Sequence, residues 1–339
     1  MASSRALRLL AQTSVALLLV LSFSSQRQGI NTAFPHAKHD VTVYGESTWV
    51  TMAADELESQ ARTLRRTCAN SPAMFHRNHP RIASLTAQFG DGLPYRRAVT
   101  THILHSMVHR TPLHIFTAPI IDSLWNKHAF ILSVLLAELA KPPAERLEWL
   151  FWVDGDTVVL DYCQSPATFL PTVSSGASNT DKPQLNALVN KDMNGLNNGV
   201  FLLRVDEWSV NLVANVIGFR HYRPDVELPH SEQSAMELLM GEKKFKDAVR
   251  YVPQHWFNAY YEGRTENYLE RKSITEMEEF RVRRGDFLVH FPGLEDKESV
   301  IADWLNVSSR VGNAWQSGTA LRDLTAEIAA FWNDSGDII

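Results

Sequence analysis

The chain has 339 residues, of which 45% are hydrophobic and 21% are charged, so it can bury a sizeable core and is not a disordered protein. Its net charge of -5 argues against nucleic acid as a bulk partner, because phosphate backbones require a basic surface. The cysteines, Cys68 and Cys163, are too few for a structural zinc site, and the sequence leaves open whether they form a disulfide.

Basic residues precede an apolar segment at Leu9–Phe23, which is the pattern of a secretory-pathway signal. The segment is short for a spanning helix, which needs roughly 17–25 residues. Residues 1–25 are therefore either a retained signal-anchor or a cleaved signal peptide. In both cases the remainder would be lumenal or extracellular, where Asn306 and Asn333, each in an Asn-x-Ser triplet, could accept N-glycans.

Residues 26–80 are polar and rich in histidine, and they are predicted to form a stem followed by a lead-in helix around Leu57 and Leu64. The folded domain is predicted to occupy residues 81–339. Its first half alternates predicted strands with predicted helices, which favours βαβ units, a mostly parallel central sheet and a Rossmann-like single α/β domain. The predicted elements are a strand at Ile82–Phe89, a helix at Tyr95–His109, a strand at Leu113–Phe116, a helix at Trp125–Leu139 and a strand at Trp149–Val153.

The second half is less regular. A loop over the functional site is expected at Ala167–Leu185, and the Asn197–Gly199 stretch is predicted to be a turn before a buried strand that ends at Arg204. Further predicted elements are a helix from Trp208, a helix opened by Ser231, a strand within Asp286–Gly293, and a C-terminal amphipathic helix marked by Leu321, Leu324, Ile328 and Phe331.

Asp154 and Asp156 follow directly on the apolar strand Trp149–Val153, with Gly155 between them. Unpaired buried charge costs several kcal/mol, so both carboxylates are expected where the strand leaves the core. In open α/β sheets the carboxyl ends of the strands are where ligands bind. Two carboxylates at that edge suit a divalent cation that carries a phosphate group. This Asp-x-Asp triplet is the only one in the chain.

Four other residues are candidates for the same site, each with a structural alternative. His290 ends a later apolar strand and could complete a metal's ligand set, or it could be structural. Glu232 opens a helix, where a carboxylate is also favoured by the helix dipole. Lys127 could be no more than part of a solvated helix face, and Asn197 no more than a turn residue.

Five segments occur in the order and spacing of one known family. The segments are Trp125–Lys127, Phe151–Asp156, Asn197–Arg204 with Trp208 and Ser209, Glu232–Gln233, and Val289–Gly293. With them the chain resembles glycosyltransferase family 34, the galactosyl-, mannosyl- and xylosyltransferase family of fungi and plants, over about residues 81–293.

The resemblance implies a GT-A fold and a manganese-dependent transfer of a hexose with retention of anomeric configuration. The donor would be a UDP- or GDP-sugar carrying galactose or mannose, less readily xylose, and the acceptor an oligosaccharide or other glycan. The family also implies a single-pass type II Golgi membrane protein with a lumenal catalytic domain, as a homo- or hetero-oligomer or alone.

The family's site residues can be carried over by position. Asp154, Asp156 and His290 would bind manganese and the diphosphate. Glu232 and Gln233 would be the catalytic residues that face the donor sugar. The remaining residues predicted to bind the nucleotide sugar are Lys127, Ala87 and Asn197, the last on the acceptor side.

The chain departs from the family at three positions. Leu294 stands where members often have a cysteine, and Glu295 where a basic residue is expected, with Lys297 two places later. These changes put the diphosphate contact from this loop in doubt. Ser231 stands where an acidic residue is common, which weakens the case for a second carboxylate there.

Two other functions remain open on the sequence. An Asp-x-Asp after an apolar strand also resembles the nucleophile motif of haloacid dehalogenase phosphatases, in which the first aspartate is phosphorylated. That family has the motif on its first core strand, whereas here at least two βα units precede it. A non-catalytic, glycan-binding relative is the second alternative, and Leu294 and Glu295 would be its signs.

Overall fold

The computed structural model describes residues 41–45, 54–74, 79–171, 184–310 and 318–334. The predicted N-terminal signal at Leu9–Phe23 lies outside these ranges. Within them, no helix is both long enough and apolar enough to span a membrane.

The described residues form one α/β fold around a seven-stranded sheet with the strand order β1-β3-β2-β4-β7-β6-β8. The pairings β1–β3, β3–β2, β2–β4 and β6–β8 are parallel, so the expected α/β class with a mostly parallel sheet is confirmed. The strands are β1 (Val41–Tyr44), β2 (Ile82–Ala87), β3 (Leu113–Phe116), β4 (Trp149–Val153), β6 (Ala187–Asp192), β7 (Gly195–Arg204) and β8 (Val249–Tyr251). A second sheet has the order β5 (Thr157–Val159), β10 (Leu288–His290) and β9 (Ala259–Tyr260).

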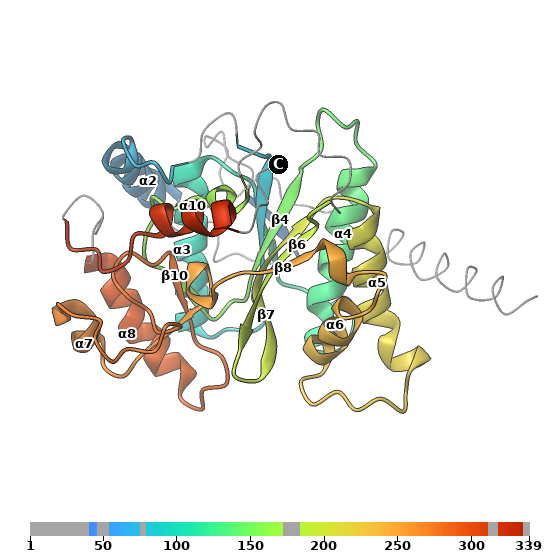
Figure 1. Ribbon diagram of the computed structural model, residues 1–339. Coiled ribbons are helices and arrows are strands. Elements are labelled where there is room, and N and C mark those ends of the chain that lie inside the picture. Colours follow the sequence, from blue (N-terminus) through green and yellow to red (C-terminus); the bar gives the residue numbers. More distant parts are fainter. Residues whose placement is uncertain (1–40, 46–53, 75–78, 172–183, 311–317, 335–339) are drawn as a thin grey trace, which may run out of the picture.

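Helices cover both faces of the large sheet (Figure 1). One face carries α4 (Asn126–Leu139), α5 (Glu207–Tyr222) and α6 (Glu232–Met240). The small sheet lies on the other side with α2 (Ala54–Cys68), α3 (Leu93–His109), α7 (Thr265–Glu270), α8 (Lys297–Arg310) and α10 (Leu324–Asp334). Short 3-10 helices are η2 (Ser123–Trp125), η3 (Pro166–Phe169), η4 (Lys246–Ala248) and η5 (Gln254–Trp256).

Strand β4 lies in the middle of the large sheet and is buried on both faces, as its apolar sequence predicts. Side chains alternate along a strand, so Leu150 and Trp152 pack under α4 and α5, whereas Phe151 and Val153 pack on the opposite face. Each such side chain contributes roughly 1.5–3 kcal/mol through burial. The strand is therefore a rigid support for the residues that follow it.

Two elements that the sequence analysis assigned to the stem belong to this fold. Strand β1 pairs in parallel with β3, with Val41 opposite Leu113. Helix α2 packs on α3, and Leu57 and Ala61 share a core cluster with Val99. The four residues of β1 are too few to show a clear period in a polar stretch, which is why the prediction placed them outside the domain.

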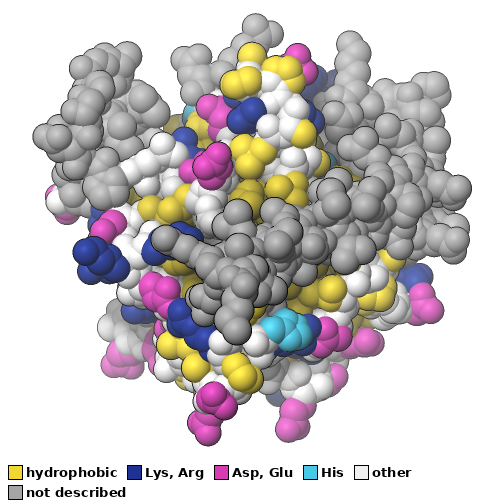
Figure 2. Space-filling view, turned by 90° about the vertical axis from the view of Figure 1, so that its right-hand side faces the viewer, with side chains coloured by type: hydrophobic (Ala, Val, Ile, Leu, Met, Phe, Trp, Pro, Cys, Tyr) yellow, Lys and Arg dark blue, Asp and Glu magenta, His cyan; other side chains and the backbone are white. Residues whose placement is uncertain are grey.

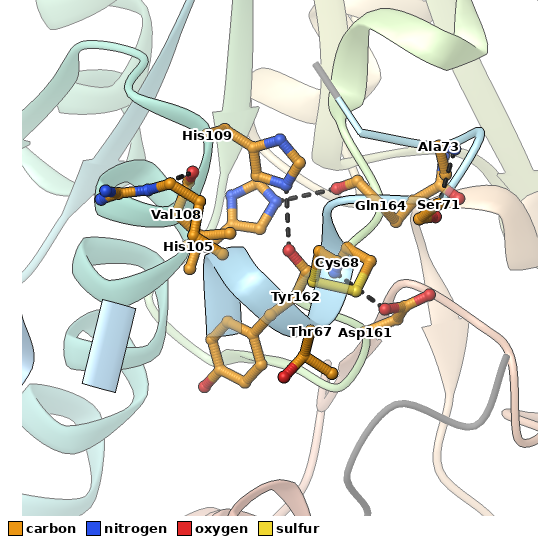
Figure 3. The surroundings of a disulfide bond; sticks show 12 residues. Thr67, Cys68, Ser71, Ala73, His105, Val108, His109, Asp161, Tyr162 and Gln164 are labelled. Carbon is orange, nitrogen blue, oxygen red and sulfur yellow. Dashed lines mark hydrogen bonds between the residues drawn. A yellow bond between two sulfur atoms is a disulfide. The ribbon is translucent and has the colours of Figure 1, made fainter. Parts of the chain in front are cut away.

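A disulfide joins Cys68, at the end of α2, to Cys163, which follows β5 (Figure 3). Both cysteines are buried, and they lie 95 positions apart in sequence. The sequence left this pairing open. The bond fixes α2 to the segment that leads away from the Asp-x-Asp motif.

Three buried histidines of α3 bind the same segment. Burial lowers the pKa of His102 to about 3 and that of His105 to about 4, so both rings are neutral near pH 7. The Nε2 atoms of His105 and His109 lie 2.8 and 3.0 Å from backbone carbonyl oxygens, those of Gln164 and Tyr162 (Figure 3). The ring of His102 lies 2.8 Å from the Thr157 hydroxyl. Helix α3 thus holds the chain directly after the Asp-x-Asp motif.

The turn predicted at Asn197–Gly199 is wrong, because these residues lie inside β7. The turn between β6 and β7 is made instead by Met193 and Asn194, and the Asp192 side chain accepts a hydrogen bond from the Asn194 backbone. Such an Asx turn uses the same residue types as the predicted one, so composition alone could not separate the two positions.

The remaining predicted elements fared differently. The helices at Tyr95–His109, at Trp125–Leu139, after Trp208 and after Ser231 are present as α3, α4, α5 and α6. The C-terminal helix begins at Leu324, so Leu321 precedes it, and its buried face is Leu324, Ile328 and Trp332. Residues 172–183 of the predicted loop lie outside the described ranges, and its first part forms η3.

Figure 2 shows the side of the molecule on which α4, α5 and α6 lie in Figure 1. Acidic and basic side chains are interspersed there, with hydrophobic side chains between them. A mixed surface of this kind is typical of a solvated face.

Candidate active site

Several chain segments meet at one edge of the large sheet. Strands β2 and β4 end there, and β7 begins there because it runs antiparallel to β4. In the small sheet, His290 at the end of β10 pairs with Thr157, which directly follows the Asp-x-Asp motif. Together these segments line a cleft of about 820 Å³. Its lining includes Asp154, Asp156, Gln233, His290 and Lys297.

Asp154 is held in place from two sides. Its carboxylate accepts a hydrogen bond of 2.7 Å from the Trp152 indole and lies 3.0 Å from the Lys127 ammonium. Its backbone N–H donates to the carbonyl of Gly199 on β7. The side chain remains 29% exposed, so one part of the carboxylate is accessible from the cleft.

Asp156 is more deeply enclosed, at 13% exposure, and it has two cationic or potentially cationic neighbours. Lys297 donates to its Oδ2 at 2.7 Å, and the Nε2 of His290 lies 3.3 Å from its Oδ1. Burial by itself raises the pKa of the Asp156 carboxyl. The His290 and Lys297 interactions outweigh this and hold that pKa well below its usual range, so the group is ionised.

Two glycines allow these groups to come this close. A Cβ on Gly155 would lie 2.6 Å from the carbonyl oxygen of Ala87, at the end of β2. A Cβ on Gly199 would lie 2.3 Å from the imidazole of His290. A side chain at Gly155 would displace the end of β2, and one at Gly199 would displace the His290 ring.

Asp154, Asp156 and His290 form a group that could hold a metal ion, as predicted. One ligand atom from each residue lies within 4.8 Å of the others. In octahedral coordination two adjacent ligands about 2.2 Å from an ion lie roughly 3.1 Å apart, close to the 3.3 Å between His290 Nε2 and Asp156 Oδ1. The donor set and its spacing therefore fit a divalent cation of the first transition series.

Lys127 is buried, at 8% exposure, so the alternative of a solvated helix face is wrong. Its ammonium donates to the Asn198 carbonyl at 2.9 Å and to the Asn198 side chain at 3.1 Å, in addition to its contact with Asp154. Glu232, which is 2% exposed, lies 3.8 Å from the same ammonium. Lys127 thus links α4, β7 and α6 beneath the cleft.

The two residues predicted to be catalytic lie at different depths. Gln233 lines the cleft, and its Oε1 accepts from the Asn198 backbone N–H at 3.1 Å. Glu232 is buried behind it and lies 3.4 Å from the Asn198 side-chain amide. Ser231 occupies the N-cap position of α6 with a φ of 52° but makes no side-chain capping bond.

Lys297 supplies the basic group that the family pattern places at the position of Glu295. It begins α8, and this helical start directs its ammonium into the cleft, where it bonds Asp156. The basic group thus reaches the site although it comes two residues later than the family pattern expects. Glu295 does not supply this contact.

Asn197 lies in the cleft lining, but its side-chain amide is occupied by protein groups. Its Oδ1 accepts from the Gly199 backbone N–H at 2.9 Å and from the Asn258 amide at 3.0 Å. Its Nδ2 donates to Tyr260 at 2.7 Å and to Asp192 at 3.1 Å. These four bonds use all the donors and acceptors of the amide.

Sequence reasoning missed three further residues of the site. Gln88 and Tyr95 line the cleft from the end of β2 and the start of α3. Asn258 is fully buried and bonds the ring of His290. Gln88 lies near the end of a predicted strand and Tyr95 begins a predicted helix, so both could have been suspected from their position, whereas nothing in the sequence marks Asn258.

The arrangement combines a candidate metal group with two ammonium groups along one cleft. Carboxylates and an imidazole can hold a divalent cation, and the cation with Lys297 can neutralise a diphosphate. Gln233 offers an amide to a neighbouring polar ligand such as a sugar hydroxyl.

Sequence comparison agrees with this chemistry. The sequence model of the galactosyl transferase GMA12/MNN10 family matches residues 113–300. An uncharacterized alpha-1,2-galactosyltransferase of Schizosaccharomyces pombe is 24% identical over 195 residues, covering 50% of this chain and 52% of that protein. Galactomannan galactosyltransferase 1 of Cyamopsis tetragonoloba is 27% identical over 183 residues, covering 45% of this chain and 40% of that protein. The chain thus spans about half or less of the length of these relatives.

Among solved structures, the chain is similar to a glycosyltransferase involved in the glycosylation of the major capsid of PBCV-1. The similarity has a TM-score of 0.46 at 14% sequence identity, and it covers 66% of this chain and 99% of that structure.

Proposed function

The chain belongs to the galactosyl transferase GMA12/MNN10 family, and from this premise we propose that it is a metal-dependent glycosyltransferase that uses a nucleotide-sugar donor and a glycan acceptor. Its α/β architecture, with the Asp-x-Asp motif at the end of β4, is of the GT-A type that the resemblance implied. The observation that carries the proposal is the group formed by Asp154, Asp156 and His290 in the lining of a large cleft.

The donor that we propose is a nucleotide-activated hexose, with galactose first. Both relatives are named as galactosyltransferases. One name specifies an alpha-1,2-galactosyltransferase and the other a galactomannan galactosyltransferase. Mannose is the second choice and xylose the third. These sugars differ by one or two hydroxyl contacts, and Gln233, which lines the cleft, is positioned to make one of them.

The metal that we propose is manganese, held by Asp154, Asp156 and His290. The bound ion would neutralise the diphosphate and so favour its departure from the sugar. Lys297 supplies a further positive charge for the phosphates from α8. Lys127 and Glu232 hold Asp154 and Asn198 from below, so that these groups need not reorganise when the donor binds.

The phosphatase alternative is not favoured. Strands β2 and β3 with their helices precede the Asp-x-Asp motif, whereas the phosphatases have the motif on their first core strand. The non-catalytic alternative loses its main support because Lys297 provides the basic group that Glu295 lacks.

We also propose that the chain works in the Golgi lumen as a type II membrane protein. The basic residues and the apolar segment at Leu9–Phe23 are consistent with such an anchor. The Cys68–Cys163 disulfide supports an oxidising compartment, since structural disulfides are rare in the cytosol.

The proposal is tested by incubating the purified lumenal portion, residues 26–339, with Mn²⁺ and each of UDP-galactose, GDP-mannose and UDP-xylose, with oligosaccharide acceptors. Mass spectrometry then detects the elongated acceptor. We expect one hexose to be added, only with metal present, and none by the Asp156→Asn variant. Absence of transfer from all donors, together with phosphate release from phosphomonoesters, would favour the phosphatase instead.

A further inference from the structure

A chain of buried side chains connects the predicted metal ligand His290 to the far side of the site. The Nδ1 of His290 lies 2.7 Å from the Asn258 Oδ1, and the Asn258 Nδ2 lies 3.0 Å from the Asn197 Oδ1. Asn258 is 0% exposed, Asn197 is 5% exposed and His290 is 2% exposed. Water therefore cannot replace any of these contacts easily.

A backbone group fixes the direction of the hydrogen bonds that link Asn197, Asn258 and His290. The Gly199 N–H can only donate, and it lies 2.9 Å from one end of the Asn197 amide, so that end is the oxygen. An oxygen there requires the facing end of Asn258 to be its NH2 group. The other end of Asn258 is then an oxygen, which requires a donor on His290. The Nδ1 of His290 therefore carries a proton.

The outer end of the chain agrees with this direction. The Asn197 NH2 group faces two acceptors, the Asp192 carboxylate at 3.1 Å and the Tyr260 hydroxyl oxygen at 2.7 Å. The Tyr260 hydroxyl donates its own proton to Asp192 at 2.5 Å. Burial, followed by the bond to Asp192, raises the pKa of Tyr260 above its usual range, so this donor remains protonated.

We infer that Asn258 and Asn197 are positioning residues that keep a proton on the Nδ1 of His290 and fix its ring orientation, so that its Nε2, which faces the Asp156 Oδ1 at 3.3 Å, can give its lone pair to the metal ion. The inference rests on the proposed function, because it concerns the metal site assigned there. It gives Asn197 a different role from the acceptor contact predicted from the family.

The arrangement has a chemical consequence. A metal-binding histidine is typically oriented by a hydrogen bond from its other nitrogen, and loss of that partner costs about 10–100-fold in metal affinity. Here the partner is an asparagine whose own orientation depends on a second asparagine and on the Gly199 backbone. The negative charge of Asp192 stands at the outer end and favours the same polarity along the chain.

The first experiment measures the tautomer directly. Long-range ¹H–¹⁵N correlation spectra of metal-free protein labelled with ¹⁵N-histidine, recorded at pH 8.5, distinguish a ring protonated at Nδ1 from one protonated at Nε2. The His290 signals are identified by their loss in His290→Gln. We expect a proton on Nδ1, with or without a second proton on the Nε2 that faces Asp156. An Nε2–H tautomer would overturn the inference whether or not the protein is a transferase.

The second experiment measures the affinity for Mn²⁺ alone, by the electron paramagnetic resonance signal of the free ion. Asn258→Leu is expected to weaken binding by about 10–100-fold. The matched control is Asn190→Leu, which removes another fully buried asparagine whose amide bonds the carbonyls of Val252 and Pro253 and not His290. Its affinity should change less than threefold.

The outcomes separate the two ideas. If wild type binds Mn²⁺ and Asn258→Leu binds it equally well, the positioning role is wrong while the metal site stands. If wild type binds no Mn²⁺ even with UDP or GDP present, the proposed function is wrong. Should Asn258→Leu fail to fold, the tautomer of His290 in wild type decides the inference on its own.

Discussion

Replacement of Lys127 by methionine should destabilise the fold by about 3 kcal/mol. The methionine keeps most of the apolar stem but removes an ammonium that lies 3.0 Å from Asp154 and 3.8 Å from Glu232. At an effective dielectric constant of about 20, each attraction has a gross Coulomb energy of roughly 4–6 kcal/mol, much of which replaces lost hydration. Removing one partner of a buried ion pair typically costs about 3–5 kcal/mol.

The lower end of that range follows from the unequal burial of the two carboxylates. Asp154 is 29% exposed and can recover water when Lys127 is lost, whereas Glu232 is 2% exposed and cannot. Most of the cost should therefore come from Glu232. Replacing Glu232 by glutamine in the same chain removes the uncompensated charge, and the double variant should recover at least half of the loss.

The assay is equilibrium urea unfolding followed by tryptophan fluorescence, for wild type, Lys127→Met, Glu232→Gln and the double variant. The four free energies of unfolding form a double-mutant cycle, which isolates the coupling between the two side chains. We expect a coupling of about 2 kcal/mol. A Lys127→Met variant within 1 kcal/mol of wild type, or a double variant no more stable than that single one, would refute the reasoning.

The other predictions concern charge, pH and the disulfide. Lys297→Ala should raise the KM for the nucleotide sugar at least tenfold in steady-state kinetics. The melting temperature should stay nearly unchanged, because Asp156 keeps its contact with His290. An unchanged KM would contradict the contact between Lys297 and the phosphates. Burial raises the pKa of Asp161 from 3.8 to about 6, so the native state keeps a proton that the unfolded chain loses, and stability falls as pH rises through this window. Asp161→Asn retains the acceptor for the Cys163 N–H. Its free energy of unfolding should exceed that of wild type by roughly 2–3 kcal/mol at pH 7.5 and equal it near pH 3.5. The same difference at both pH values in urea unfolding would argue against the raised pKa of Asp161. Removing both cysteines opens a loop of 95 residues and should lower the free energy of unfolding by about 4–5 kcal/mol. A loss below 2 kcal/mol would contradict a stabilising role for the disulfide.

The part of the fold that sequence predicts best is the part with strong periodic or continuous apolar patterns. Strands β3 and β4 and helix α4 were predicted to within one residue of their observed bounds because their burial dictates their composition. Strand β1 is four residues long in a polar stretch, and α8 was not predicted at all. The contacts that stabilise β1 are distant in sequence and leave no local pattern. Helix α8 does carry the i, i+3, i+4 spacing of a helix at Ile301, Trp304 and Leu305, and the prediction overlooked it.

The site shows the same division. The position of Asp154 and Asp156 at a sheet edge follows from the cost of burying charge, and the structure places them there. The Asn197–Gly199 stretch has turn composition yet lies in β7, where Gly199 is needed because the His290 ring leaves no room for a Cβ. Local turn statistics cannot register a contact with a ring 91 residues away (290 − 199).

Buried polar groups are the hardest to foresee. Lys127 has the sequence context of a helix surface, and only the convergence of α4, β7 and α6 shows that its ammonium is enclosed. Asn258 lies in an extended segment with no motif, and its role depends on Asn197 and His290, which come from two other strands. Such networks are properties of the tertiary structure.

The central claim is that Asp154, Asp156 and His290 bind a metal ion together with a nucleoside diphosphate. Isothermal titration calorimetry of UDP and of GDP into the purified protein, with and without Mn²⁺, tests it most directly. We expect one of the two nucleotides to bind only when Mn²⁺ is present, and Asp156→Asn to weaken that binding at least 100-fold while its melting temperature stays near that of wild type. Equal nucleotide binding with and without the metal, or by the variant, would contradict the claim.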